Sequence, residues 1–288
     1  MKNKNTNNEI MNVLSLFDGM SCGQIALERA GIKVNKYFAA EIKKHAIEVT
    51  QHNYPNTIQL GDVTKVKAND LPKIDLLIGG SPCQDFSRAN KERKGVEGSK
   101  SSLFFEYVRL LKECKPKYFL LENVIMSDYN YWFICNELDC EPVRICGSLV
   151  SGALRDRLYW TNIPPFSYDI TGRLISNIPQ PKDKKIYLQN ILDSGTTKKR
   201  KHSCLNTNSG ATGKSKQEYL LHRNKTTGMI TLIYEKNCVR TVNQNELEKL
   251  HNIPKGYTSI LNQTKAGDLI GDGWTVDVVT HIFKNIKQ

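Results

Sequence analysis

The sequence has few of the features that mark membrane, secreted or zinc-binding proteins. No stretch comes near the roughly 18 consecutive apolar residues that a membrane-spanning helix needs. Its first residues are rich in Lys and Asn and have no apolar core, unlike a signal peptide. The eight cysteines stand at irregular spacings without a Cys-x-x-Cys pair, unlike a disulfide framework or a zinc site. We therefore expect a soluble cytoplasmic protein with reduced thiols and no metal.

Acidic residues are fewer than basic residues, and most of this difference lies in one segment of the chain. The chain has 41 Lys and Arg against 29 Asp and Glu, a net charge of +12. Residues 166–240 alone hold 14 of the basic and 5 of the acidic residues, including the basic run 198–201. A basic segment attached to a nearly neutral body suggests contact with a polyanion, although a solvated lysine-rich surface is the simpler alternative. On the first interpretation, neutralising residues 198–201 should weaken nucleic-acid binding.

The pattern of apolar residues predicts an α/β fold with a doubly wound, mostly parallel sheet. Short apolar runs alternate with helical stretches between residues 13 and 162, and these runs do not alternate with polar residues, as expected for strands buried on both faces. The expected strands are 13–16, 37–40, 76–78, 118–121, 144–149 and 158–161, and the expected helices are 23–30, 43–52, 103–114, 131–138, 245–250 and 275–286. We expect residues 11–165 and 241–288 to form a catalytic domain, and residues 166–240 an irregular, basic subdomain.

Three loop ends suggest a nucleotide pocket at one edge of the sheet. Residues 17–23 form a glycine-containing turn between the first strand and a helix, although the spacing is not that of a dinucleotide fingerprint. Glu41 ends the second strand, where an acid can bind both ribose hydroxyls, and Asp62 could bind an adenine amino group. Each feature alone also fits an ordinary solvated turn.

Two further strand ends and a pair of arginines could carry chemistry. Cys83 follows the strand 76–78 in a Gly/Pro-shaped loop, where backbone amides can favour a thiolate, whereas a lone cysteine is usually a small buried apolar residue. Glu122 ends the strand 118–121 and should lie at the same edge of the sheet as Cys83. Arg155 and Arg157 alternate along a strand and can point into one site.

Taken together and in order, these motifs resemble those of the DNA cytosine-5 methyltransferases. They are Phe-Asp-Gly at 17–19, Gly-Ser-Pro-Cys-Gln at 80–84, Glu-Asn-Val at 122–124, the arginines at 155 and 157, and Gly-Asp-Gly-Trp at 271–274. The resemblance covers nearly the whole chain, and residues 93–95, 103–106 and 253–258 look most like the animal de novo branch without its regulatory domains. The bias towards Lys, Asn and Ile suggests a bacterial or phage enzyme.

The resemblance implies a reaction and assigns roles to residues. Cys83 would add to carbon 6 of a flipped cytosine, Glu122 would hold and protonate ring nitrogen 3, and Asn123 would support the loop or the base. Arg155 and Arg157 would orient the cytosine carbonyl, the carboxylate and the sugar-phosphate. The cofactor would be S-adenosylmethionine, converted to S-adenosylhomocysteine, with no metal. Its predicted contacts are Phe17, Asp18, Cys22, Glu41, Ile42, Asp62, Val63, Pro82, Leu103 and Trp274.

The same resemblance places double-stranded DNA against residues 166–240. The predicted DNA-recognition residues are Lys199, Arg200, Asn206, Thr207 and Asn208. Asn206 occupies the place where the animal enzymes carry an arginine that reads the guanine of CpG. Because asparagine pairs best with adenine in the major groove, we expect a different or relaxed 3′ neighbour.

Several alternatives and partners remain open. The chain could instead methylate cytosine in tRNA, although the family's tRNA-directed members usually have Pro-Pro-Cys-Gln where this chain has Ser-Pro-Cys-Gln. It could also be an inactive DNA-binding partner subunit, which the joint presence of Cys83, Glu122 and both arginines argues against. A homo-oligomer through the Phe104-Phe105 helix and a cognate restriction endonuclease are further possibilities, and an apolar pair in a helix is more often core.

Overall fold

Seven strands form the central sheet, and all but one of them run in the same direction. The computed structural model describes residues 10–82, 102–205 and 231–286. The strands are β1 (Met11–Leu16), β2 (Val34–Ala40), β3 (Ile58–Gln59), β4 (Leu76–Gly79), β5 (Tyr118–Val124), β7 (Val143–Cys146) and β8 (Asp156–Thr161). Their order is β3-β2-β1-β4-β5-β8-β7, with β8 antiparallel to both of its neighbours. The strand order reverses between β1 and β4, which is where doubly wound sheets bind their ligands.

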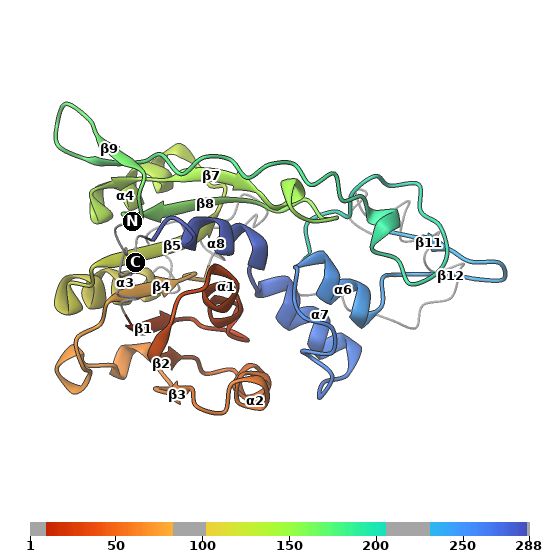
Figure 1. Ribbon diagram of the computed structural model, residues 1–288, viewed down its shortest axis with the longest axis horizontal. Coiled ribbons are helices and arrows are strands. Elements are labelled where there is room, and N and C mark those ends of the chain that lie inside the picture. Colours follow the sequence, from red (N-terminus) through yellow and green to blue (C-terminus); the bar gives the residue numbers. More distant parts are fainter. Residues whose placement is uncertain (1–9, 83–101, 206–230, 287–288) are drawn as a thin grey trace, which may run out of the picture.

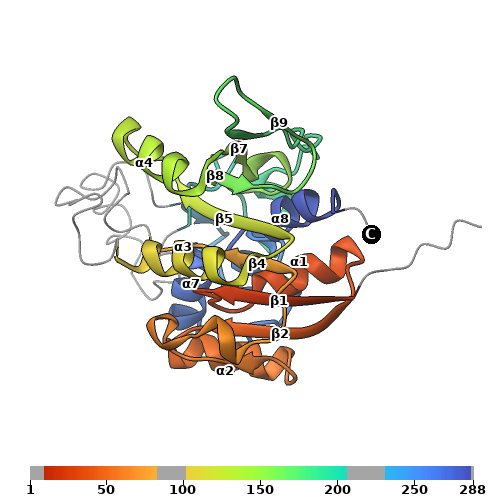
Figure 2. The ribbon, with the colours of Figure 1, turned by 90° about the vertical axis from the view of Figure 1, so that its left-hand side faces the viewer.

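Helices cover both faces of this sheet, as Figures 1 and 2 show. The helices are α1 (Cys22–Ala30), α2 (Lys44–Asn53), α3 (Ser102–Cys114), α4 (Asp128–Leu138), α6 (Gln244–Leu250), α7 (Gln263–Asp272) and α8 (Val276–Phe283). One apolar core contains Val13 with side chains of α1, α2 and α8, and the other contains Leu14 with side chains of α3 and α4. Successive strand residues therefore enter opposite cores, which explains the unbroken apolar runs.

A second, three-stranded sheet lies beyond the edge of the first. It has the order β6-β10-β9 and consists of β6 (Cys140–Glu141), β9 (Phe166–Tyr168) and β10 (Leu174–Ser176). Residues 166–176 thus form a hairpin that pairs with β6 beside α4 (Figure 1). The remaining short elements are β11 (Ile233–Tyr234), β12 (Val239–Arg240) and the 3-10 turns Val63–Lys65, Ala68–Asp70, Gly147–Leu149 and Leu188–Asn190.

The structure corrects several element boundaries. The strand expected at 144–149 ends at Cys146, because the chain turns at Gly147, whose N–H donates to the Arg155 carbonyl over 2.7 Å. The last helix ends at Phe283 instead of residue 286, and α7 was not anticipated from the sequence. The doubly wound, mostly parallel α/β fold itself is confirmed.

Two further expectations concern surfaces. None of the helices in the described part of the chain has the length and apolar character required to cross a bilayer. In α3, Phe104 is fully buried and packs near Phe133, so it belongs to the core. Phe105 is 42% exposed, and any contact between subunits through this helix would have to use Phe105.

Candidate active site

The loop after β1 has an unusual backbone. Phe17, Gly19 and Ser21 all have positive φ angles close to 60°, and Ser21 is the N-cap of α1. This conformation is costly for a bulky residue such as Phe17 and persists where function or surrounding structure requires it. The Asp18 carboxylate accepts hydrogen bonds from Ser21 and from the Tyr37 hydroxyl (2.7 Å). Burial raises the pKa of Asp18 to about 6, against the lowering effect of these bonds. Its side chain therefore braces the loop.

The Glu41 carboxylate joins the loop after β1 to the start of the loop after β2. One oxygen accepts the Gly19 N–H, and the other accepts the N–H groups of Ile42 and Lys43, each over 2.8 Å. The Ile42 side chain beside it is 74% exposed, which is unusual for isoleucine. A fixed carboxylate can bind ribose hydroxyls, and the exposed apolar side chain next to it can pack against an adjoining base.

Asp62 lies at the neighbouring strand end. Its Oδ1 accepts both the backbone N–H and the hydroxyl of Thr64, and these hydrogen bonds lower the pKa of its carboxyl group. Both bonds use Oδ1, so Oδ2 is available to a further donor. Val63 is buried in the α3 side of the core, and the predicted contacts Pro82 and Leu103 are half-buried.

Trp274 adjoins the same loops from the C-terminal part of the chain. A β-carbon built on Gly80 would lie 3.0 Å from Trp274 Nε1 and 3.1 Å from Glu122 Oε2. A β-carbon on Gly23 would lie 3.7 Å from the Trp274 ring. Cys22 is buried behind this contact, and burial raises the pKa of its thiol to about 12, so it is an unreactive packing residue here. Gly80 thus separates Trp274 from the Glu122 carboxylate.

Glu122 and Arg157 form a buried ion pair. Arg157 Nε lies 2.9 Å from Glu122 Oε1, and both side chains are about nine-tenths buried. Burial lowers the pKa of the Arg157 guanidinium, but Glu122, Cys204 and Tyr159 together outweigh this effect and raise the pKa. This contact is an ion pair without hydrogen-bond geometry. Glu122 Oε1 can therefore still accept a hydrogen bond. The antiparallel pairing of β5 with β8 brings the two charges together.

Arg155 reaches the same site but has different partners. Its Nη1 donates to the carbonyls of Gly271 (3.1 Å) and Leu205 (3.4 Å), while Nε has no hydrogen-bond partner among the described residues. Burial and the neighbouring Arg157 lower its pKa, although an arginine remains charged. Cys204 Sγ lies within 4.0 Å of a guanidinium nitrogen of each arginine. Nothing in the sequence pattern pointed to Cys204.

Asn123 holds the loop that leads towards Cys83. Its amide nitrogen donates to the Ser81 hydroxyl over 3.1 Å, and its amide oxygen accepts the Val124 N–H. Ser81 and Asn123 are both buried. Of the two roles expected for Asn123, this geometry favours support of the loop. Cys83 itself lies outside the described residues, as do Asn206, Thr207 and Asn208.

Comparison with known proteins agrees with this arrangement. The profile of the family described as C-5 cytosine-specific DNA methylase matches residues 11–127, which contain the loops after β1, β2, β4 and β5. The match covers less than half of the chain. The resemblance seen in the motifs is thereby confirmed for the cofactor side of the site.

Curated relatives match over a similar length. An orphan methyltransferase, M.SPRI of Bacillus phage SPR, is 43% identical over 116 residues, which is 40% of this chain and 26% of that protein. The type II methyltransferase M.NlaIV of Neisseria lactamica is 44% identical over 115 residues, 38% of this chain and 27% of that protein. The matched part thus spans about a quarter of the length of these methyltransferases.

Solved structures match over nearly the whole chain, at low identity. A mutant DNMT2 of Spodoptera frugiperda has a TM-score of 0.65 at 18% identity and covers 96% of this chain and 99% of its own. The methyltransferase EhMeth of Entamoeba histolytica has a TM-score of 0.72 at 14% identity, with coverage of 96% and 98%. These likenesses show that the chain shares the fold of these two proteins.

The basic run 198–201 divides into outward and inward side chains. Lys198 and Arg200 are exposed and lie against the rings of Tyr234 and Tyr187, respectively. Lys199 is half-buried and donates to the Ser203 hydroxyl. Lys201 Nζ donates to the carbonyls of Ser148 and Ser151, both at 2.7 Å, and to that of Ile186. The expectation that all four side chains bind a polyanion is therefore wrong for Lys201, whose ammonium hydrogens are all used internally.

A salt titration should separate these two groups of residues. Changing both Lys198 and Arg200 to Gln should weaken DNA binding and reduce the slope of log K against log salt by roughly 2, because each lost phosphate contact removes about 0.9. Changing Lys201 to Gln should lower the melting temperature and leave that slope nearly unchanged, since Lys201 holds backbone segments together. Equal changes in slope for the two variants would contradict this division.

His202 follows Lys201 and is buried. Its backbone pairs with Gly152 and Leu154, which positions the strand leading into Arg155. Burial lowers the pKa of its imidazole to about 4. Because the folded form has the lower pKa, the stability that neutral His202 supplies is complete above about pH 6.5 and is lost as the pH falls towards 4.

The lowered pKa of His202 predicts that acid destabilises the folded protein, and replacing His202 should remove this contribution. Between pH 7.5 and 5 the wild type should lose about 2 kcal/mol more unfolding free energy than a His202→Gln variant. Asp18, whose raised pKa acts in the opposite direction, is present in both proteins and cancels in the difference. Denaturant titrations at the two pH values measure it, and parallel losses in both proteins would refute the assignment to His202.

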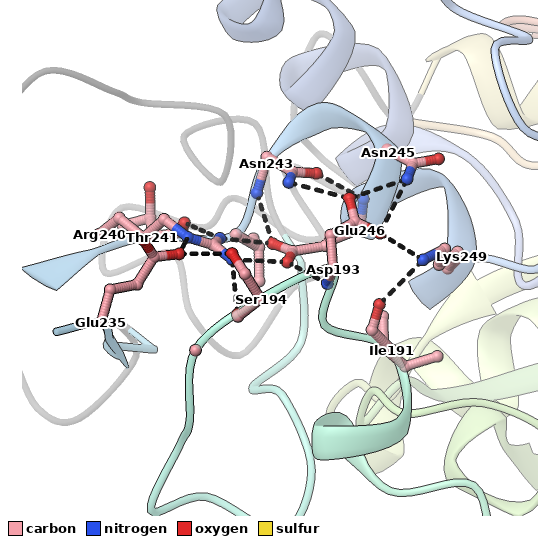
Figure 3. Close-up of polar contacts among 12 residues, drawn as sticks. Ile191, Asp193, Ser194, Glu235, Arg240, Thr241, Asn243, Asn245, Glu246 and Lys249 are labelled. Atoms are coloured by element: carbon pink, nitrogen blue, oxygen red, sulfur yellow. Dashed lines mark hydrogen bonds and ion pairs between the residues drawn. The ribbon is translucent and has the colours of Figure 1, made fainter.

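Figure 3 shows that part of the basic charge is neutralised within the protein. Arg240 pairs with Glu235 and with the fully buried Glu246, each at 2.7 Å, and these bonds raise the pKa of its guanidinium. Lys249 lies 2.6 Å from Asp193, and this bond lowers the pKa of Asp193 to about 2. The network joins residues 191–194 and β12 to α6, so Arg240 is not available to bind DNA.

Proposed function

We propose that this chain transfers a methyl group from S-adenosylmethionine to carbon 5 of cytosine in double-stranded DNA. The observation that carries the proposal is the buried Glu122–Arg157 ion pair, set beside Gly80 in the loop that leads to Cys83. The match of residues 11–127 to the C-5 cytosine-specific DNA methylase family and the names of the relatives support it.

The residues around the β1 loop fit the proposed cofactor. Glu41 offers a carboxylate oxygen with one N–H partner to a ribose hydroxyl, and Asp62 offers Oδ2 to an adenine amino group. The exposed Ile42 and the half-buried Phe17 supply apolar surface for the base. Bound there, the sulfonium of S-adenosylmethionine supplies the methyl group. Trp274 and Gly80 then lie between the cofactor loop and Glu122.

On the other side of Gly80, the described residues are suited to hold cytosine. The thiolate of Cys83 adds to carbon 6, so that carbon 5 gains the electron density to accept a methyl group. Glu122 holds ring nitrogen 3 of the cytosine. Arg155 Nε has no hydrogen-bond partner among the described residues and can donate to the base or to the sugar-phosphate of its nucleotide. Since carbon 5 is inaccessible within a stacked duplex, the base is flipped into the site at a cost of a few kcal/mol, which phosphate contacts offset.

Transfer of labelled methyl groups tests the proposal. Purified protein should label duplex DNA and not tRNA, and digestion should release 5-methylcytosine. Bisulfite sequencing of the product should show methylation outside CG, because Asn206 stands where an arginine would read guanine. Labelling of tRNA alone would replace the proposal with an RNA methyltransferase. Binding of DNA without transfer to either polymer would indicate a partner subunit.

The phage and bacterial sources of the relatives support a bacterial or phage enzyme that acts in the cytoplasm. Pairing with a restriction endonuclease is a further proposal, suggested by the relatives named type II methyltransferases. Self-association through α3 would rest on Phe105 and is tested by changing Phe105 to Ser and measuring the mass in solution.

A further inference from the structure

Two loops that flank the proposed cofactor are joined by an ion pair. Lys43 Nζ lies 2.6 Å from Asp272 Oδ2, with half or slightly less of each side chain exposed. Lys43 comes two residues after Glu41, and Asp272 comes two residues before Trp274. Glu41 accepts the Gly19 N–H, and a backbone hydrogen bond joins Trp274 to the Cys22 thiol, so the ion pair completes a ring of contacts that returns through residues 19–22.

Each charge stands at a helix end that disfavours it. Lys43 is the N-cap residue of α2 and provides no side-chain cap, while Asp272 is the last residue of α7. A helix dipole favours negative charge at the N-terminus and positive charge at the C-terminus. Asp272 also lies one turn from Asp268, whose pKa is raised by burial and by Asp272. Neither α2 nor α7 gains stability from the charge at its end. The ion pair between the two helix ends accounts for the presence of both Lys43 and Asp272.

We propose that Lys43 and Asp272 are a positioning pair that holds the Glu41 loop and the Trp274 segment together around bound S-adenosylmethionine. This inference rests on the proposed function. The pair slows release of the cofactor, because the ring cannot widen at this point without separating the two charges. It has no part in the methyl transfer itself.

Charge reversal tests the pair. The single variants Lys43→Asp and Asp272→Lys should each raise the Kd for S-adenosylhomocysteine about fivefold, the upper range for an exposed ion pair, mainly through faster dissociation. The double variant, with the two charges exchanged, should return close to the wild-type value. In 0.5 M NaCl the differences between variants should shrink, because salt screens exposed charges.

A matched control is the exposed pair Lys112–Glu137, which joins α3 to α4. Exchanging those two charges should leave cofactor binding unchanged. For the Lys43 and Asp272 variants, the KM for S-adenosylmethionine should rise while kcat and the melting temperature of the cofactor-free protein stay within error.

Two results would overturn the inference. One is a double variant that binds no better than the single variants, and the other is a loss of cofactor-free stability as large as the loss of binding. If the wild type binds S-adenosylhomocysteine and no variant differs from it, the inference fails and the proposed function stands. A wild type that binds no S-adenosylhomocysteine would overturn the proposed function, and this inference with it.

Discussion

Replacing Cys83 with alanine should abolish methyl transfer while DNA and S-adenosylhomocysteine still bind. Without a thiolate to add at carbon 6, carbon 5 of cytosine is too weak a nucleophile to accept the methyl group. The other contacts with the cofactor and with phosphates do not involve this side chain. Incorporation of labelled methyl into duplex DNA, compared with binding of both ligands, measures the separation.

Covalent trapping on modified DNA tests directly whether Cys83 is the nucleophile. In DNA with 5-fluorocytosine at the target, carbon 5 carries no proton to lose after methylation, so the cysteine cannot be eliminated. The wild type should form a cofactor-dependent complex that survives denaturing electrophoresis, and Cys83→Ala should form none. Cys204→Ala is the matched control, because its thiol contacts the site arginines and should not form the adduct. Trapping by the Cys83 variant would assign the nucleophile elsewhere.

Changing Glu122 to glutamine should lower kcat by about two to four orders of magnitude, the usual contribution of a positioned acid or base. Glutamine keeps the shape of the side chain but cannot supply a proton to ring nitrogen 3 in the same way. It also leaves the Arg157 guanidinium buried without its counter-charge, which weakens the placement of Arg157. Single-turnover rates of methyl transfer to duplex DNA test this expectation.

The residue between the two arginines provides the control. Asp156 pairs with Arg144 on the exposed side of β8. Asp156→Asn removes a carboxylate one residue from Arg157 and should change kcat less than threefold, since exposed ion pairs contribute about 1 kcal/mol or less. A similar fall in both variants would mean that Glu122 acts only through the general electrostatics of the site.

The position of the site was predictable because strand ends are local features. Glu41, Asp62 and Glu122 each follow a short apolar run, and parallel strands bring their carboxyl ends to one edge. The motifs around Cys83 and the two arginines were equally readable. The family match to residues 11–127 includes the motif around Cys83 and does not extend to the arginines. Local hydrophobic pattern and residue spacing were enough for the α/β class and for the approximate positions of the main strands and helices.

The hydrophobic pattern of the sequence did not predict the contacts of individual polar side chains. Lys201 looked like its neighbours in the basic run, yet its ammonium donates to three carbonyls from two separate segments of the chain. Cys204 and Gly271 approach Arg155 from segments 49 and 116 residues away. Such partners depend on how loops return to the sheet, which hydrophobic periodicity does not encode.

The sequence by itself thus determined the fold class, the sheet edge that carries the site and the chemical types available there. Only the tertiary structure decided which charges are free and which are already paired, as for Arg240 with Glu246 and Lys43 with Asp272. The physical reason is that secondary structure follows from neighbouring residues, whereas the state of a charge depends on desolvation and on partners brought together by packing.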